Sequence, residues 1–360
     1  MRRRSGSGPA TTRVVVIVLV LLAALVAPAA GVPAPTAGAA DPAAKGVLEG
    51  SRYTPLTPAR ILDTRTGNGA PAAPVGAGQT IEVTVAGRSG VAPDATAVAL
   101  NVTATEPTNA SYLKVWPTGE AKPGTSSLNF AAQQTIANLV VVKLGTGGKV
   151  SIYNPTGTVH VLGDVVGSYG PSGATAGSLH HALPPFRILD TRKGTGAPLA
   201  PVGTKQTIDV DVTGVGGVPT DGVAAVVLNV TATSPTATSY LKIWPTGAAK
   251  PDASTLNFVT NQTIPNLTIV KVGTGGMISI YNPTGTVHVI ADVVGWYGID
   301  GAPEGAAHTA VTPARVFSTR DGIGTTVGKI AAGSTKTLTV LGADGLPATG
   351  ISAVVFNVTA

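Results

Sequence analysis

The sequence contains the same long stretch of residues twice and the beginning of a third copy. Residues 101–170 and 229–298 are identical at 50 of 70 positions when they are aligned at an offset of 128 residues. Both stretches open with Asn-Val-Thr-Ala, which returns at residues 357–360. Solenoid repeats are only about 20–50 residues long, so this period indicates tandem copies of a whole domain. We therefore expect any function to be carried out by an array of modules.

This repeat predicts the organisation of the chain. The stretches between the copies are rich in Gly, Ala, Ser and Pro, which is typical of short flexible linkers. Residue 360 lies within a strand pattern, so we expect the third copy to be incomplete and the sequence to be a fragment of a longer protein. The predicted parts are a signal peptide at 1–40, a linker at 41–52, modules at 53–170 and 181–298, linkers at 171–180 and 299–308, and a partial module at 309–360.

The N-terminus has the pattern of an export signal. Three arginines precede an apolar run from Val14 to Val26, and Ala37–Ala39 offers a small-residue cleavage site. An uncleaved leader is the alternative, because the uncharged stretch from Val14 to Val32 is close to the minimum for spanning a bilayer. The sequence therefore predicts a secreted or cell-surface protein that meets a membrane only through an uncleaved leader.

The charge of the chain excludes one class of partner. The formal net charge is +6, but four of the 24 basic residues and none of the 18 acidic residues lie in residues 1–40. The remaining 20 basic and 18 acidic residues leave +2 with no basic run. We do not expect nucleic-acid binding, which requires a concentrated basic surface. The chain also has no cysteine, so each module must be held together by its core alone.

The pattern within each copy is that of an all-β protein. Runs rich in Val, Ile, Thr and Leu alternate with turns rich in Gly, Pro and Asn, and no helical period follows the leader. We predict tandem β-sandwich modules of the immunoglobulin-like or jelly-roll kind, with small β-barrels as the alternative. The expected strands of the first copy lie at residues 80–86, 96–103, 112–116, 126–130, 139–144, 150–153 and 158–166.

An acidic residue and an arginine open each complete copy. Asp63 and Arg65 are repeated as Asp190 and Arg192, whereas the third copy has Ser318 in place of the acid. One interpretation is a structural ion pair that fixes the N-terminal segment to the sandwich. The other is a site for an acidic or polyol ligand.

A histidine and an aspartate recur in the last strand of each copy. His160 and Asp164 are repeated as His288 and Asp292, and residues four apart in a strand lie on one face. Two residues are too few for a metal site, which needs at least three ligands, and no aligned nucleophile accompanies them. We therefore interpret them as structural polar residues and expect no catalytic residue, metal or cofactor.

A lysine between two aromatic residues is the strongest candidate for ligand binding. In the first copy, strand alternation places Tyr112, Lys114 and Trp116 on the face opposite the core. The same pattern recurs at Tyr240, Lys242 and Trp244. One hypothesis is an exposed platform on which sugar rings stack. The alternative is that the aromatic rings cover the sheet edge against the loop at 117–124.

Three asparagines occupy equivalent places in the strand pattern. Asn101, Asn229 and Asn357 each begin an Asn-x-Thr triplet, which marks glycosylation only in a suitable host. We expect their side-chain amides to bond neighbouring backbone instead.

Several of these segments together resemble a known kind of module. Ile-Leu-Asp-Thr-Arg at 61–65, Leu-Asn-Val-Thr-Ala-Thr at 100–105 and Val-His-Val-Ile-Ala-Asp-Val-Val-Gly-Trp-Tyr at 287–297 are similar to modules repeated in secreted proteins of actinobacteria. Those modules often accompany cell-wall hydrolases, peptidases or other extracellular domains. The resemblance covers nearly all of residues 53–360 and implies an exported accessory module, without assigning site residues.

These observations predict a secreted, non-catalytic repeat protein of the cell surface that binds cell-wall or other extracellular glycan through tandem modules. One alternative is an inert spacer that presents another domain. A further alternative is a set of accessory modules of an extracellular hydrolase whose catalytic domain lies beyond residue 360. The oligomeric state is left open.

Overall fold

The computed structural model describes residues 50–299, 305–343 and 346–359 of the chain. The predicted signal peptide and most of the linker at 41–52 lie outside the described residues. Within them the regular structure consists of sixteen strands and two short 3-10 turns, Thr146–Gly148 and Thr274–Gly276. In this part of the chain, no helix has the length and apolar character needed to cross a membrane.

Each complete copy forms eight strands. In the first copy they are β1 (Tyr53–Asp63), β2 (Gln79–Thr84), β3 (Ala97–Thr105), β4 (Ser111–Pro117), β5 (Leu128–Phe130), β6 (Ile136–Lys143), β7 (Lys149–Asn154) and β8 (His160–Tyr169). In the second copy they are β9 (His180–Asp190), β10 (Gln206–Asp211), β11 (Val223–Thr233), β12 (Ser239–Pro245), β13 (Leu256–Phe258), β14 (Ile264–Lys271), β15 (Met277–Asn282) and β16 (His288–Gly298).

The order of the strands identifies the sandwich as a jelly roll. The first module pairs a β1-β8-β3-β6 sheet with a β2-β7-β4-β5 sheet, and every strand pairing is antiparallel. The second module repeats this order as β9-β16-β11-β14 and β10-β15-β12-β13. Consecutive strands that pass between two four-stranded sheets in this way make the double Greek key of a jelly roll. The β-sandwich prediction is confirmed, and the β-barrel alternative is wrong because the sheets do not close.

Strand β1 is absent from the strands expected from the sequence. It contains Pro55 and Pro58, which remove two backbone donors and normally argue against a strand. The strand lies at the edge of its sheet, where a missing donor costs little, and its register with β8 shifts between Pro55 and Ala59. An edge position therefore permits a sequence that would be unsuitable in the centre of the sheet.

Each module buries its own core between its two sheets. Alternation in β4 directs Leu113 and Val115 inward, and both are fully buried. They belong to an apolar cluster contributed by residues of the first module, and an equivalent cluster with Leu241 and Ile243 fills the second. Burial of a side chain of this size contributes roughly 1.5–3 kcal/mol, so each copy has the core that a folded domain requires.

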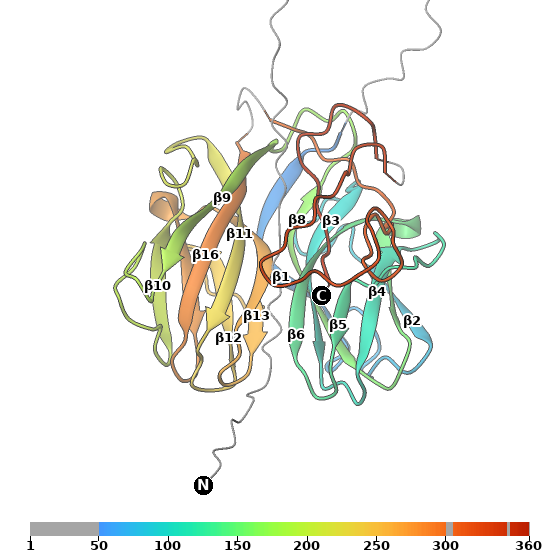
Figure 1. Ribbon diagram of the computed structural model, residues 1–360, viewed down its shortest axis with the longest axis horizontal. Helices are drawn as coiled ribbons and strands as arrows, with labels where there is room; N and C mark the ends of the chain where they lie inside the picture. The colour runs from blue at the N-terminus through green and yellow to red at the C-terminus, as the bar shows by residue number, and fades with distance from the viewer. Residues whose placement is uncertain (1–49, 300–304, 344–345, 360) are drawn as a thin grey trace, which may run out of the picture.

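A third apolar cluster joins the two modules. All nine residues of β3 are buried, because Val98 and Leu100 point into the module core while Ala97 and Ala99 point away from it. The outward alanines pack with residues of the second module, among them Val227 and Ile269. Small side chains on this face let the sheets approach closely. The two sandwiches consequently lie side by side in contact (Figure 1).

Backbone bridges connect the beginnings of all three copies in a closed cycle. Tyr53, His180 and His308 each lie ten residues before the position of Asp63, Asp190 or Ser318, and Ser51, Ser178 and Ala306 lie twelve residues before it. Tyr53 pairs with Ser178, His180 with Ala306, and His308 with Ser51. The six N–H to O distances are 2.7–2.9 Å. The first copy thus bonds the second, the second the third, and the third the first.

These bridges correct the prediction of flexible linkers between separate modules. Ser178 belongs to the predicted linker at 171–180, and Ala306 and His308 belong to that at 299–308. A backbone held by two-way hydrogen bonds is an ordered part of the fold. The composition of the linkers carried no information about the strand-like pairs at their ends.

The third copy lies against the first module. Its described residues form no extended strand, but a bridge joins Ser318 and Ile323 at the position of the Asp63–Asn68 bridge in the first module. In Figure 1 the C-terminal segment, drawn in red, runs across the first module. Asn357 fixes its end there by donating to the carbonyl oxygens of Ser126 and Ser127 at 2.8 and 3.0 Å.

The last strand of each complete module has a glycine at the position where an aromatic ring packs against the strand. A Cβ atom added to Gly167 would lie 2.0 Å from the Tyr53 hydroxyl oxygen, and one added to Gly295 would lie 2.6 Å from His180 Nε2. Both rings belong to the residues that form the backbone bridges. The absence of a side chain at Gly167 therefore leaves room for the Tyr53 ring against β8.

We expect Gly167→Ala to destabilise the protein by about 1–3 kcal/mol, which is the usual cost of overpacking. Gly170→Ala is the matched control, because a Cβ atom there meets nothing within 4 Å. Chemical denaturation of the two variants measures the difference. Equal unfolding midpoints would show that the Tyr53 ring does not need this space.

Candidate functional site

The tryptophans of the predicted platform are buried. The side chain of Trp116 is 6% exposed, and its indole N–H donates to the carbonyl oxygen of Glu120 at 3.1 Å. Trp244 is equally buried and donates to Ala248 at 3.1 Å. The structure thus places both rings on the outward side of the sheet but beneath the loop that follows the strand. This is the arrangement of the alternative hypothesis, and the indole faces are not open to a sugar ring.

The lysines of the same strands are also held by this loop. Lys114 Nζ donates to the carbonyl oxygen of Pro123 at 2.7 Å, and Lys242 Nζ donates to that of Pro251 at 2.7 Å. The ammonium groups lie 5.7 and 5.8 Å from the ring centroids of Tyr112 and Tyr240. Burial is the main cause of a lowered pKa at both lysines. Each lysine therefore anchors the loop over the sheet.

A second tyrosine, which was not among the residues predicted from the sequence, lies on this outer face. Tyr153 of β7 lies opposite Lys114 in the register and is half-buried. The ammonium group of the exposed Lys122 is 3.6 Å from the centroid of its ring. In the second module Lys250 lies 3.7 Å from the centroid of Tyr281. Identical Ser-Ile-Tyr-Asn strands in the two copies, with Tyr on the outward side, were the available signal.

The residues that open each module form an ion-pair network around a turn. Asp63 accepts hydrogen bonds from Arg65 Nε at 3.0 Å and Nη2 at 2.8 Å, and also from the Arg65 backbone N–H at 3.0 Å. These bonds lower the pKa of Asp63. Asp190 and Arg192 make the same contacts, which lower the pKa of Asp190 to about 2. Asp63 is buried, so these contacts offset the cost of its desolvation.

The histidine and aspartate of the last strand do not meet each other. His160 Nδ1 is 3.0 Å from the hydroxyl of Thr64, whereas Asp164 accepts from Arg60 Nε at 2.8 Å and Nη2 at 3.0 Å. Burial raises the pKa of Asp164 even though Arg60 opposes this shift. In the second module His288 pairs with Thr191, and Asp292 pairs with Arg187. The structure therefore brings each residue to a partner from the opening segment.

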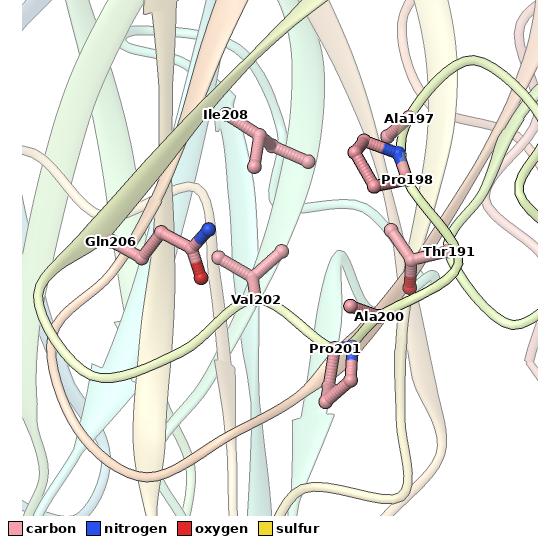
Figure 2. A pocket seen from close by; sticks show the side chains of 8 residues that line it. All are labelled: Thr191, Ala197, Pro198, Ala200, Pro201, Val202, Gln206 and Ile208. Carbon is pink, nitrogen blue, oxygen red and sulfur yellow. The ribbon is translucent and has the colours of Figure 1, made fainter.

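The described residues lack a cluster of metal ligands, and one small hollow lies in the second module. No group of three or more His, Cys, Asp or Glu side chains among them could hold a metal ion. A hollow in the second module has a volume of about 50 Å³ (Figure 2). Small-molecule pockets usually have about 300–1,000 Å³. The hollow is lined by Thr191, Ala197, Pro198, Ala200, Pro201, Val202, Gln206 and Ile208.

Aromatic rings from all three copies gather between the modules. The Tyr53 ring centroid is 5.0 Å from that of Tyr169 and 4.3 Å from that of Tyr297. The hydroxyls of Tyr169 and Tyr297 are 2.9 Å apart, and His308 stacks on Tyr169 at 4.2 Å. Burial raises the pKa of Tyr53 and Tyr169 well above the usual value, and that of Tyr297 to about 12. These rings are neutral parts of an inter-module core.

Asn101 and Asn357 bond residues of another copy rather than of their own. Asn101 Nδ2 donates to the carbonyl oxygens of Ser254 and Thr255 at 2.8 and 3.3 Å, and its Oδ1 accepts from Asn266 Nδ2 at 2.9 Å. The sequence predicted bonding to neighbouring backbone. The backbone is neighbouring in space but belongs to the second module, some 150 residues away along the chain.

Comparison with known proteins adds little. No protein-family model matches the chain, and no curated protein sequence matches it. One similar solved structure is the N-terminal CBM22-1–CBM22-2 tandem domain from Paenibacillus barcinonensis Xyn10C. It is 11% identical, with a TM-score of 0.20, and the match covers 72% of this chain and 100% of that one.

We expect the contact between the copies to weaken as the pH falls from 6.5 to 4. Burial, with the nearby charges of His181 and His308, lowers the pKa of His180 from 6.5 to about 4, and burial alone lowers that of His308 to about 4. Between pH 6.5 and pH 4 the unfolded chain binds protons that the folded chain does not. The free energy of unfolding therefore decreases as the pH falls, by up to about 3 kcal/mol per histidine.

Thermal unfolding at intervals from pH 7.5 to pH 4 measures this effect. The variant His308→Gln cannot titrate at this position, so its unfolding temperature should fall less across the window than that of the parent. A parent whose unfolding temperature is constant from pH 6.5 to pH 4 would contradict the assignment.

Proposed function

We propose that this chain is a non-catalytic repeat protein of the cell surface that binds extracellular glycan through the outer sheets of its modules. The observation that carries the proposal is a recurring group on the β2-β7-β4-β5 sheet, formed in the first module by Tyr112, Tyr153 and Lys122. Its tyrosines are half-buried and its lysine is exposed, and the second module has the same residues at Tyr240, Tyr281 and Lys250.

The chemistry of these residues suits a polysaccharide. Tyrosine offers an apolar ring edge and a hydroxyl, and the exposed ammonium group donates hydrogen bonds to sugar hydroxyls. The two outer sheets lie away from the apolar cluster between the modules, and β2 and β10 lie at opposite sides of the molecule in Figure 1. A polymer that reaches both faces, or a surface with many chains, would gain avidity from two weak sites held at a fixed spacing.

A rigid spacer is the second candidate function. The cycle of backbone bridges and the shared aromatic core hold the copies in one arrangement, as presentation of another domain would require. The tryptophans and the lysines of β4 and β12 have partners within their own modules. On this hypothesis the outer sheets bind nothing.

Retention of the protein on purified cell walls and insoluble polysaccharides distinguishes the two functions. If the outer sheets bind glycan, the parent is retained and the double variant Tyr153→Ala, Tyr281→Ala loses at least tenfold in apparent affinity, because its two sites act together. The control is Thr84→Ala with Asp211→Ala, at exposed positions of the edge strands on the same sheets. Failure of the parent to bind any of these materials would favour the spacer, and equal retention of the Tyr variant would rule out this face.

A further inference from the structure

One interface occurs twice in the molecule, between different pairs of copies. In the first occurrence Asn101 of the first module contacts Ser254, Thr255 and Asn266 of the second. Ser254 and Thr255 lie in the loop just before β13, and Asn266 lies in β14. Asn101 therefore recognises two loop carbonyls and one side-chain amide.

The second occurrence joins the third copy to the first. Asn357 Nδ2 donates to Ser126 and Ser127 at 2.8 and 3.0 Å, and Asn138 Nδ2 donates to Asn357 Oδ1 at 3.2 Å. Asn357 lies 256 residues after Asn101, and its three partners lie 128 residues before those of Asn101. The same donors and acceptors thus meet with the same polarity.

The two interfaces also share a pair of aromatic rings and an arginine near a lysine. The Tyr53 ring lies 4.3 Å from Tyr297 at an interplanar angle of 30°, and the His308 ring lies 4.2 Å from Tyr169 at 29°. Each pair joins the beginning of one copy to the end of another. Besides burial, Arg60 of the first copy lowers the pKa of Lys242, and Arg315 of the third lowers that of Lys114. The two interfaces therefore share their asparagine contacts, their ring pairs and the position of an arginine near a lysine.

An interface between unlike surfaces generates either a closed ring or an open filament. Here the third copy presents its asparagine to the first copy, and the first copy presents the equivalent asparagine to the second. The three backbone bridges already form a closed cycle, so the copies are arranged around one axis. A ring of three requires the same interface once more, from the second copy to the third.

The surface of the second module that would make this contact is incomplete. Asn229, which is equivalent to Asn101, has a buried Oδ1 atom without a hydrogen-bond partner among the described residues. The ion pair nearby is also more open, because the Asp292 side chain is 21% exposed and that of Asp164 is 1% exposed. Two other buried polar atoms, on Thr103 and Asn257, also have no partner in the described part of the chain. Their equivalents in the interface between the third copy and the first are Thr359 and Asn129, which are joined by a hydrogen bond. The Oδ1 atoms of Asn101 and Asn357 each accept a hydrogen bond from an asparagine amide, whereas Asn229 Oδ1 has no such partner among the described residues.

We propose that the outer face of the β9-β16-β11-β14 sheet around Asn229 is the third interface of a closed three-module ring. Its occupant is a further module of the same kind, which presents the surface that residues 233–298 form in the second module. The recognising groups of that occupant are two successive carbonyl oxygens before a Leu-Asn-Phe strand and the amide of the asparagine in the next strand. Asn229 accepts from this amide and donates to these carbonyls.

The test completes the third copy with the protein's own sequence. Residues 233–298 are joined after Ala360, which is equivalent to Ala232, and the extended chain is compared with the chain of 360 residues. We expect a monomer in which backbone amides of β9 and β11 exchange with solvent at least tenfold more slowly than in the shorter chain. An added segment that folds but leaves these rates unchanged would overturn the proposal.

Substitution of the asparagines gives an independent readout with an internal control. Asn101→Ala should lower the unfolding temperature of both chains by a similar amount, because its interface is complete in both. Asn229→Ala should have little effect on the shorter chain and should match Asn101→Ala in the extended chain. An equal effect of Asn229→Ala in both chains would contradict the ring. Dimerisation of the shorter chain through this face would show that the occupant is a second copy of the chain instead.

Discussion

The cyclic backbone pairing of Tyr53, His180 and His308 with Ser178, Ala306 and Ser51 determines the arrangement of everything else. Each pair closes two hydrogen bonds and brings the beginning of one copy against the next. The aromatic rings then meet on the axis, and the flat alanine face of β3 is covered. Without this cycle the copies would be separate sandwiches, and β3 would expose apolar surface to water.

The same constraint explains residue choices that the module cores alone do not require. Ala97 and Ala99 are small because another sheet packs against them, and Gly167 lacks a side chain because the Tyr53 ring occupies that space. Asn101 is polar within an apolar strand because its partners are backbone groups of the second module. Each of these residues lies in a contact between copies, so its role is apparent only when the copies are seen together.

The sequence predicted what depends on local pattern. Alternation in β4 and turn residues around Asn154 and Pro155 were sufficient to find most strands and the β-sandwich class. Strand order was not predictable, because alternation specifies a face but not a neighbour. The apolar run without alternation at 97–100 was a sequence sign of a second covered face, since strands buried on both sides lose alternation. Alternation placed Trp116 on the outward face but could not decide between an open platform and a ring covered by the loop that follows the strand.

The central claim is that the first two modules form one rigid body around this axis. The described residues contain no cysteine, so spin labels can be attached at cysteines introduced at the exposed positions Thr84 of β2 and Asp211 of β10. The distance between the labels is measured by pulsed electron paramagnetic resonance. We predict a single narrow distribution near neutral pH. A broad distribution, as expected for modules on a flexible tether, would contradict the account.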